Sequence, residues 1–416
     1  MPDFERRGME FPDRKLIAFV TRVERIGPEP YGRSSFEFDA IDAETSEEEM
    51  ERAISVPNIT APFAVLRVVT TEARFHRNYG FLPVEGMWVE LSIEPSGKFR
   101  GPITFHSQLG PDGYSEHTKG RLSDARLLFR TGEDPKLPVP LGASVANAFS
   151  KAAALANLCQ FPIDAIGPHY RVRAVLRSLR NVLCICVRDV GQASFVSLLD
   201  GNGKPCAHFD AGWPISFNRH TAPKQVPLIS GNAPVILSHW DWDHLHAYHR
   251  CNGLSATRWL TPIQPLGPGA RKVANQLNAA GNLIGYSGPS VIFRDGILVA
   301  CSGPAGPNDN GLALALKLSS GKLALLVGDA SYDSLGHWAS IAPFNLLVVT
   351  HHGAEFAGGV PLASSVSSDG VVSVGRGNVY KHPRQSALDR HTRAGWQLKQ
   401  TASAASVPRA DRYLGP

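Results

Sequence analysis

Residues that could bind a metal ion crowd the segment 235–247, whose sequence is VILSHWDWDHLHA. Two histidines and two aspartates fall within six residues of this segment: His239, Asp241, Asp243 and His244. Imidazole nitrogens and carboxylate oxygens are common metal ligands, and alternate residues of an extended loop point to the same side. The spacing therefore predicts metal ligation by this loop. Trp240 and Trp242 alternate with the ligands and are expected either to pack beneath the site or to stack on nucleic-acid bases.

The end of the motif predicts the start of a helix. Asp243 could cap a helix that begins at His244, which would turn His244 toward a second, adjacent ligand position. We therefore expect two neighbouring metal sites supplied by one loop. His246 and His249 lie beyond the loop and are expected at the surface or in contact with substrate, not as ligands.

Several strands must converge to position such a site. From about residue 171 the chain alternates short apolar runs with polar clusters, as in CAHFDAGWP, PVILSHWDWDH, GKLALLVGDASYD and FNLLVVTHHGA. Loops that follow strands usually carry functional residues, and helices such as 269–281 could cover the outer faces. The pattern predicts stacked sheets with the site assembled along one edge.

The pattern HxDxDH at 239–244 resembles the HxHxDH motif of the metallo-β-lactamase superfamily, with Asp241 in place of the middle histidine. Its surroundings resemble the hydrolase domain of the ComEC-type competence (DNA-uptake) proteins. The stretches that carry this likeness are VRDVGQASFVSLL (187–199), HFDAGWP (208–214), NDNGLALALKL (308–318) followed by LALLVGDASYD, VVTHHGA (348–354) and SVGRGNVYKHP (373–383). Their order and spacing agree with the family over about 170–400.

This resemblance implies an αββα sandwich over 166–416 with a dinuclear metal site. The implied metal ligands are His239 and Asp241 for one ion, Asp243, His244 and His382 for the other, and Asp329 as the bridge. Asp210 would orient ligands through hydrogen bonds. The implied catalytic residues are Asp243, His244, Asp329 and His352.

One histidine of the superfamily has no counterpart in this chain. Its neighbourhood is occupied by Asn308, Asp309 or Asn310. His351 and His352 are both expected near the site, where one of them could ligate a metal or protonate a leaving oxygen.

The ligand chemistry favours phosphodiester hydrolysis. Two divalent ions about 3.5–4 Å apart can lower the pKa of a shared water and clamp the oxygens of a phosphodiester. The carboxylate of Asp241 in place of an imidazole favours a harder ion, Mn²⁺ first, with Mg²⁺ or Zn²⁺ as alternatives. Three basic residues flank His382 and could either grip phosphate or be solvated loop charges: Arg376, Lys381 and Arg384.

Composition points to a polyanionic partner and a reduced compartment. Residues 1–165 hold 19 Lys+Arg against 24 Asp+Glu, whereas residues 166–416 hold 23 against 13, and a basic half favours nucleic acid. No apolar run approaches the roughly 18–20 residues needed to cross a bilayer. The N-terminus lacks the apolar core of a secretory signal, and the six cysteines form no CxxC pair. We expect a cytoplasmic protein without a membrane channel, so DNA uptake as such is not implied.

Residues 1–165 are expected to form a separate α+β module. Strands are predicted at 15–23, 63–75 and 87–95, helices at 45–55, capped by Thr45 or Ser46, and at 143–159, and a Pro/Gly-rich connector at 132–142. This half carries no recognisable chemistry and could recruit a protein partner or sense a trigger.

The sequence thus predicts a metal-dependent hydrolase, most simply a nuclease that cleaves DNA, or less readily RNA, in a bacterial defence or DNA-processing system. Two alternatives stay open. A small-molecule phosphoesterase, acting on a cyclic nucleotide or a phosphorylated headgroup, would have a deep, narrowed pocket, whereas a nuclease would have an open basic groove. A non-catalytic binding or scaffold protein with a relic site would hold no metal.

Overall fold

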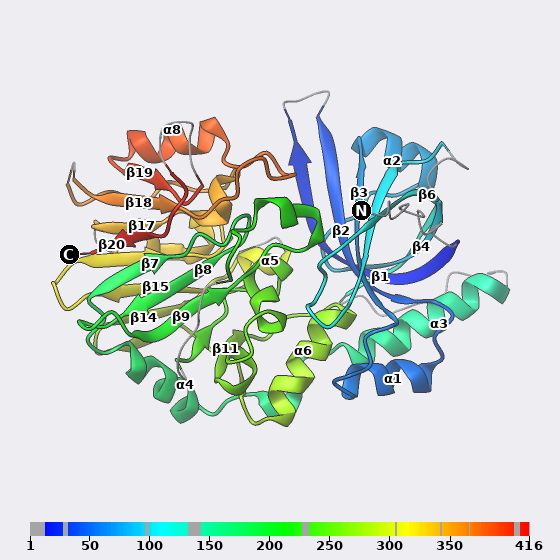
Figure 1. The fold of residues 1–416 in the computed structure, drawn as a ribbon, viewed down its shortest axis with the longest axis horizontal. Helices are drawn as coiled ribbons and strands as arrows, with labels where there is room; N and C mark the ends of the chain where they lie inside the picture. Colours follow the sequence, from blue (N-terminus) through cyan, green and yellow to red (C-terminus); the bar gives the residue numbers. More distant parts are fainter. Residues whose placement is uncertain are drawn as a thin grey trace, which may run out of the picture.

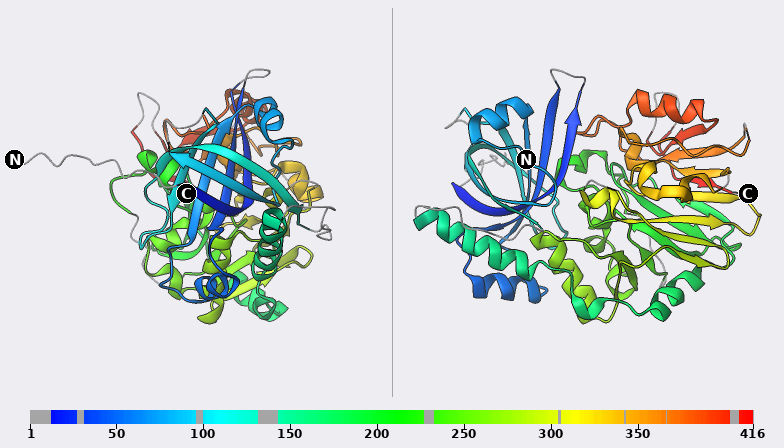
Figure 2. Two further views of the ribbon diagram at one scale, coloured as in Figure 1. Left: turned by 90° about the vertical axis from the view of Figure 1, so that its right-hand side faces the viewer. Right: turned by 180° about the vertical axis from the view of Figure 1, so that it is seen from behind.

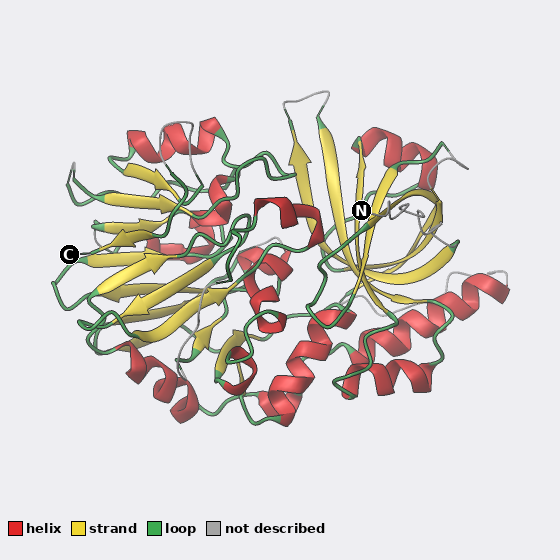
Figure 3. Cartoon of the chain, in the orientation of Figure 1, coloured by secondary structure: helices red, strands yellow, loops and turns green. Residues whose placement is uncertain are grey.

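The computed structural model describes residues 13–27, 32–95, 100–131, 143–226, 233–303, 306–341, 343–365, 367–402 and 408–415. Its strands form a closed six-stranded barrel and two seven-stranded sheets, with helices packed around them (Figure 1, Figure 3). The chain is therefore a mixed α/β protein, as its sequence predicts. None of the helices within these ranges is long and apolar enough to cross a lipid bilayer.

The barrel is built from antiparallel strands of the N-terminal part of the chain (Figure 2, left). In barrel order they are β1 (Arg14–Ile26), β2 (Arg33–Asp42), β3 (Phe63–Thr70), β5 (Ile103–Gln108), β6 (Thr118–Arg130) and β4 (Met87–Pro95). Alternate residues of these strands fill the barrel interior, among them Val20, Phe38 and Leu66. Because the barrel is closed, none of its strands has an unpaired edge.

Three helices flank the barrel, and one of them corrects a sequence prediction. Helix α1 (Glu47–Ser55) begins after Ser46, whose hydroxyl accepts a hydrogen bond from the Glu49 N–H in a capping box. Helix α3 (Ala143–Leu158) forms where predicted and contacts β1, β4 and β6. The strand predicted to run from 63 to 75 is wrong beyond residue 70, because Thr71 caps helix α2 (Glu72–Tyr79).

The rest of the chain folds into two sheets. The first has the order β12 (Leu283–Tyr286), β11 (Trp259–Pro262), β10 (Val235–Ile236), β9 (Pro205–Ala211), β8 (Phe195–Leu199), β7 (Cys184–Val187) and β20 (Arg412–Leu414). The second has the order β13 (Val291–Phe293), β14 (Gly296–Ala300), β15 (Leu312–Lys317), β16 (Leu323–Leu326), β17 (Leu346–Val348), β18 (Asp369–Val372) and β19 (Gln397–Gln400). Strands β9 to β12 run parallel, and so do β16 to β19.

The two sheets pack face to face, with helices outside. Their shared core includes Val196 and Phe209 from the first sheet and Leu314 and Leu326 from the second. Helix α6 (Pro268–Ala279) packs on the outer side of the first sheet, and helix α8 (Gln385–Arg393) covers the outer side of the second (Figure 1). Helix α4 (His169–Leu176) packs at the edge formed by β12.

The placement of the boundary near residue 165 agrees with the course of the chain, although the division into two domains stays a prediction. The strands of the barrel end at 130 and those of the sheets begin at 184. The connector predicted at 132–142 lies outside the described residues. The two short helices that remain are α5 (Trp242–Leu245) and α7 (Gly306–Asp309).

The barrel is fastened to the sheets at the start of α6. Asp39 of β2 is fully buried, and its two carboxylate oxygens accept hydrogen bonds from the N–H groups of Gly269 and Ala270, each at 3.0 Å. These N–H groups belong to the first turn of the helix and have no partner within it. Burial raises the pKa of Asp39 to about 7, although these hydrogen bonds oppose the rise.

We predict that Asp39 makes the free energy of unfolding fall as pH rises. Its folded-state pKa of about 7 exceeds the ordinary 3.8, so its contribution is full below the unfolded pKa and is lost as pH rises through the folded pKa. Between about pH 5 and about pH 7.5 the loss should be about 3 kcal/mol. Asp39→Asn, which cannot titrate, should lack this component when urea denaturation is compared at the two pH values. Parallel pH dependences of the wild type and the variant would contradict the prediction.

Candidate metal centre

The predicted ligand loop follows the short parallel strand β10. Its polar side chains are buried: His239 is 1% exposed, Asp241 and Asp243 5%, and His244 0%. The predicted cap is wrong by two residues, because Asp241 is the N-cap residue of α5 and Asp243 lies inside the helix. The helical turn places the ring of His244 beside that of His239, with the two ring centres 4.1 Å apart.

Asp329 reaches the same cluster from the second sheet. It follows β16 after Gly328, where φ is +64° and an added Cβ would lie 2.5 Å from the side chain of Ser238. This close approach of the two loops requires glycine. The Asp329 Oδ1 atom lies 3.0 Å from His244 Nε2, and Oδ2 lies 3.4 Å from His351 Nε2. Asp329 thus stands between a histidine of the first sheet and a histidine of the second.

His351 and His352 enter from the loop after β17. Both have a positive φ, 48° and 53°, which is uncommon for residues other than glycine and marks a tightly constrained turn. His352 Nε2 lies 3.3 Å from Asp243 Oδ2, while its Nδ1 donates a hydrogen bond to the Ser373 carbonyl at 2.7 Å. The tautomer with the proton on Nδ1 leaves the Nε2 lone pair facing the carboxylates.

The ring nitrogens identify the cluster as a candidate metal site. Four buried Nε2 atoms lack a hydrogen bond of acceptable geometry, those of His239, His244, His351 and His352. Buried polar atoms normally have partners, so a converging set without them calls for a missing ligand. Two groups have ligand atoms within 4.8 Å of one another: His239, His244 and Asp329, and Asp243, His244 and His352. Buried His/Asp groups in the described part of the chain could therefore hold a metal ion.

Asp210 supports the cluster from behind, as its predicted role requires. It lies near the end of β9, is fully buried, and accepts a hydrogen bond from the Ser238 N–H at 2.7 Å. Its other oxygen lies 2.8 Å from His244 Nδ1. A carboxylate on Nδ1 fixes the orientation of the ring and directs Nε2 toward the cluster.

His382, predicted as a ligand, lies beside Glu24 and His351. Its Nε2 atom is 3.0 Å from Glu24 Oε1, and its ring centre is 5.6 Å from that of His351. It belongs to neither of the two groups, and His352 stands beside Asp243 and His244 instead.

The remaining predicted site residues lie around the cluster. Asp309 accepts a hydrogen bond from the Ser331 N–H at 2.7 Å, and Asn310 donates to the Gly306 carbonyl at 2.9 Å. Asp309 belongs to neither of the two ligand groups. Among the basic residues proposed to grip phosphate, Arg376 and Lys381 are exposed, while Arg384 is partly buried and lies 4.0 Å from Glu24.

The residues that sequence reasoning missed come from strand β1 of the barrel. The Arg22 guanidinium is 3% exposed and makes a two-pronged ion pair with Asp243, with Nη1–Oδ2 at 2.9 Å and Nη2–Oδ1 at 2.7 Å. Its Nη2 also lies 2.9 Å from Asp241 Oδ2 and 3.4 Å from Asp329 Oδ2. One arginine from the N-terminal half therefore contacts all three aspartates of the predicted metal site.

A β-bulge aims Arg22 at the site. Leu16, Ala18 and Val20 point into the barrel, so simple alternation would send residue 22 inward as well. The pairing of β1 with β2 shifts between Val20 and Arg22, which inserts Thr21 as an extra residue and reverses the alternation. The only sequence signal is the break in period within KLIAFVTRVERI, and it does not reveal what the arginine meets.

Neighbouring charges shift the pKa values of Asp243 and His244 against the effect of burial. Burial raises the pKa of Asp243, but Arg22, His352 and His244 together outweigh it and hold that pKa well below the usual range. Burial lowers the pKa of His244, but Asp329 and Asp210 outweigh it and raise the pKa well above the ordinary value. Burial lowers the pKa of His351 to about 4, so this ring is neutral near pH 7 and is suited to ligation rather than to protonating a leaving oxygen.

The aromatic and histidine residues near the loop are packing residues. Trp240 and Trp242 are each 5% exposed; the Trp240 Nε1–H donates to the Pro262 carbonyl at 3.0 Å, and Trp242 packs edge-on against Tyr114. Packing beneath the site, one of the two expectations, therefore describes them. The expected surface position of His246 is wrong, because it is 1% exposed and its Nε2 accepts a hydrogen bond from the Tyr114 N–H.

The barrel closes over the cluster. The cavity between Arg22, Glu37, Asp243 and Tyr380 has a volume of only about 10 Å³, which is room for about one water molecule. Neither the narrowed pocket expected for a small substrate nor an open basic groove is present here.

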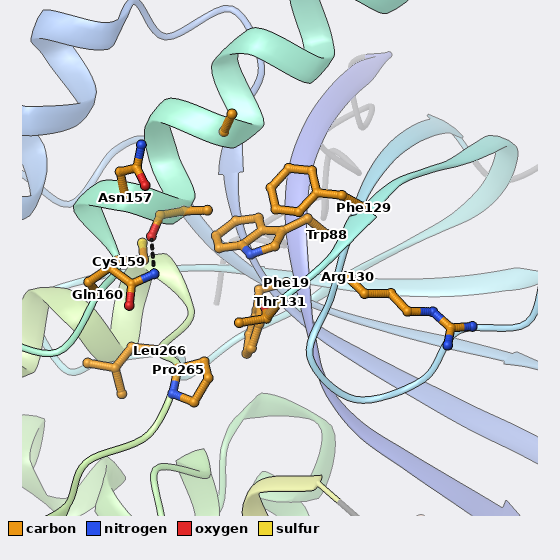
Figure 4. Close-up of a pocket in the computed structure, with 12 residues that line it drawn as sticks. Phe19, Trp88, Phe129, Arg130, Thr131, Asn157, Cys159, Gln160, Pro265 and Leu266 are labelled. Atoms are coloured by element: carbon orange, nitrogen blue, oxygen red, sulfur yellow. Dashed lines mark hydrogen bonds between the residues drawn. The ribbon is translucent and has the colours of Figure 1, made fainter. Parts of the chain in front are cut away.

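A second cavity lies outside the barrel, between barrel strands, α3 and the segment that precedes α6 (Figure 4). It has a volume of about 130 Å³, and Phe19, Trp88 and Phe129 form much of its wall. Its described lining includes no carboxylate or imidazole, and burial raises the pKa of the Cys159 thiol well above the ordinary value. This second cavity therefore lacks the carboxylates and imidazoles that the His/Asp cluster offers.

Comparison with known proteins assigns no family. No protein-family model matches this chain, and no curated protein is significantly similar to it. The metallo-β-lactamase and ComEC-type resemblance of its motifs stays a prediction.

We predict that Asp210→Asn weakens Mn²⁺ binding by roughly 10–100-fold, because the ring of His244 loses the carboxylate that orients it. Isothermal titration calorimetry on the full chain measures the effect, with circular dichroism to establish that the variant is folded. Asp369→Asn, which removes a surface ion pair with Lys399 on the second sheet, serves as the control and should bind Mn²⁺ like the wild type. Equal affinities for Asp210→Asn and the wild type would contradict the prediction.

Proposed function

We propose that this protein is a metal-dependent phosphodiesterase, most simply a nuclease that cleaves DNA, built on a metallo-β-lactamase-like αββα sandwich. The observation that carries the proposal is the convergence of buried imidazole Nε2 atoms without partners on the carboxylates of Asp243 and Asp329. The layered order of helix, sheet, sheet and helix supports the proposed fold. The position of the cluster after parallel strands is also typical of α/β catalytic sites.

The donor set fits two divalent ions. His239, Asp241 and Asp329 would hold one, and Asp243, His244, His352 and Asp329 would hold the other. When bound, such ions lower the pKa of water and stabilise the charge of a reacting phosphodiester. Three carboxylates among the donors favour Mn²⁺, with Mg²⁺ or Zn²⁺ as alternatives.

The protein's own residues would position this chemistry. Asp210 orients His244, and the Ser373 carbonyl orients His352, so both rings are held in a fixed orientation. Arg384 is the basic residue at the border of the site, 4.0 Å from Glu24, and is the candidate to bind a phosphate. The excess of basic residues in 166–416 favours a nucleic acid over a small phosphoester as the substrate.

A cleavage assay tests the proposal directly. The purified chain is incubated with Mn²⁺ and single- or double-stranded DNA, beside the double variant Asp243→Ala/His244→Ala. We expect cleavage by the wild type and at least about 100-fold slower cleavage by the variant, which lacks ligands rather than residues that only support them. The nuclease proposal would be contradicted if no divalent metal supported cleavage by the wild type, or if the variant cleaved DNA equally fast. Hydrolysis of bis-p-nitrophenyl phosphate without hydrolysis of DNA would instead assign a small-molecule phosphoesterase.

A non-catalytic protein with a relic site is the second candidate, because Arg22 already pairs with the carboxylates. Elemental analysis after dialysis against Mn²⁺ separates the two candidates. We expect about two metal ions per chain for the enzyme, as the donor set implies. Less than about one ion per ten chains would favour the relic site.

A further inference from the structure

Strand β1 places charged side chains against the aspartates and histidines of the cluster, and these contacts suggest how the site is controlled. We propose that the barrel inhibits the site by competing with metal ions for its carboxylates: strand β1 inserts Arg22 when metal is absent and must withdraw it when metal binds. This inference rests on the proposed metal-dependent function and names its regulation.

The contacts of Arg22 fall on the atoms that a metal would need. Both oxygens of Asp243 receive its N–H groups, and Asp241 Oδ2 receives Nε at 3.1 Å and Nη2 at 2.9 Å. A guanidinium carries a fixed positive charge and only donors, so it repels a cation while it occupies the lone pairs of the ligands. Arg22 and a divalent ion therefore cannot share these carboxylates without a large loss of affinity for one of them.

A second side chain of strand β1, that of Glu24, contacts histidines at the site. Glu24 is 8% exposed, and its two oxygens lie 3.0 Å from His382 Nε2 and 3.5 Å from His351 Nε2. The strand therefore offers a cation to the aspartates and an anion to the histidines. Complementarity of both signs, produced by one bulge, indicates a specific contact rather than an incidental one.

The barrel wall that covers the site is charged, which suits reversible docking. Five of its charged side chains are less than 9% exposed: Arg22, Glu24, Glu37, Asp39 and Arg67. Glu37 accepts a hydrogen bond from the Tyr380 hydroxyl at 2.8 Å, and Arg67 contacts the Val379 carbonyl. Polar interfaces within a chain separate more readily than apolar ones, because water can replace their contacts. Opening is also required for turnover, since the cavity of about 10 Å³ admits no phosphodiester.

Arg22 provides partners for only some of the polar groups that a bound metal ion would contact. It pairs the three aspartates, but the Nε2 atoms of His239 and His352 keep no hydrogen-bond partner. A guanidinium that has committed its donors to carboxylates cannot serve these acceptors. A metal ion satisfies carboxylates and imidazoles together, which favours competition over a relic site.

The test compares Mn²⁺ affinity in full-length variants by isothermal titration calorimetry. Arg22→Met removes the competing charge, and Arg25→Met changes an arginine of the same strand that pairs with Glu72 at the surface. The apparent affinity of a ligand is reduced by the fraction of protein that is competent to bind it. We therefore expect Arg22→Met to bind Mn²⁺ at least about tenfold more tightly than the wild type, and Arg25→Met to match the wild type within about twofold.

Hydrogen exchange on the wild type gives a second readout that needs no variant. Mn²⁺ should increase amide exchange across residues 20–26 of β1 and leave the barrel strand β4 unchanged. If Arg22→Met does not fold, Arg22→Lys keeps the charge but loses the two-pronged geometry, and it should bind Mn²⁺ more tightly than the wild type.

The outcomes separate this inference from the proposed function. Equal Mn²⁺ affinity in the wild type and Arg22→Met, or unchanged exchange in β1, would overturn the competition, and DNA cleavage by that wild type would leave the nuclease intact. Tighter binding by Arg22→Met without cleavage of DNA would support the competition and overturn the nuclease. Failure of every variant to bind Mn²⁺ would overturn both.

Discussion

The structure depends on how the buried negative charge at the carboxyl ends of the strands is compensated. Asp241, Asp243 and Asp329 are each at most 5% exposed, and an unpaired buried carboxylate costs several kcal/mol. Arg22 supplies one positive charge to the three, and the histidines supply the rest of the polar surroundings. Because that cation is carried on the barrel, the site joins the two halves of the chain.

The two sheets hold the site by meeting along one edge. Asp210 lies near the end of β9 and the loop of His239 to His244 follows β10, both in the first sheet, while Asp329 and His352 follow strands of the second. The core between the two sheets is close-packed, and it therefore fixes the distance between these strand ends. Tight backbone turns then aim each side chain, as the positive φ values of Asp210, His351 and His352 show.

The barrel contributes both stability and enclosure. Asp39 holds the first turn of α6, and Lys272 of α6 donates hydrogen bonds to the carbonyls of Ala53 and Val56 in and after α1. Near α3 and α6, the barrel and the sheets are held together by apolar packing. Near the His/Asp cluster, they are held together by ion pairs such as that of Arg22 with Asp243. The contact between the two halves is therefore least apolar where the chemistry would take place.

The sequence by itself determined the local elements and the identity of most cluster residues. The capping box of Ser46 and Glu49, the helical pattern of α3 and the apolar runs before polar clusters all depend on short-range periodicity. His239, Asp241, Asp243, His244, Asp329 and Asp210 could be named because their types and spacing are chemical signals in themselves. Only the tertiary structure decided that the barrel closes, that His352 rather than His382 stands beside Asp243, and that Arg22 and Glu24 face the site. These outcomes rest on pairings between residues far apart in the chain, 221 positions for Arg22 and Asp243, and on one inserted residue in β1. No local pattern encodes which distant surface a side chain will meet.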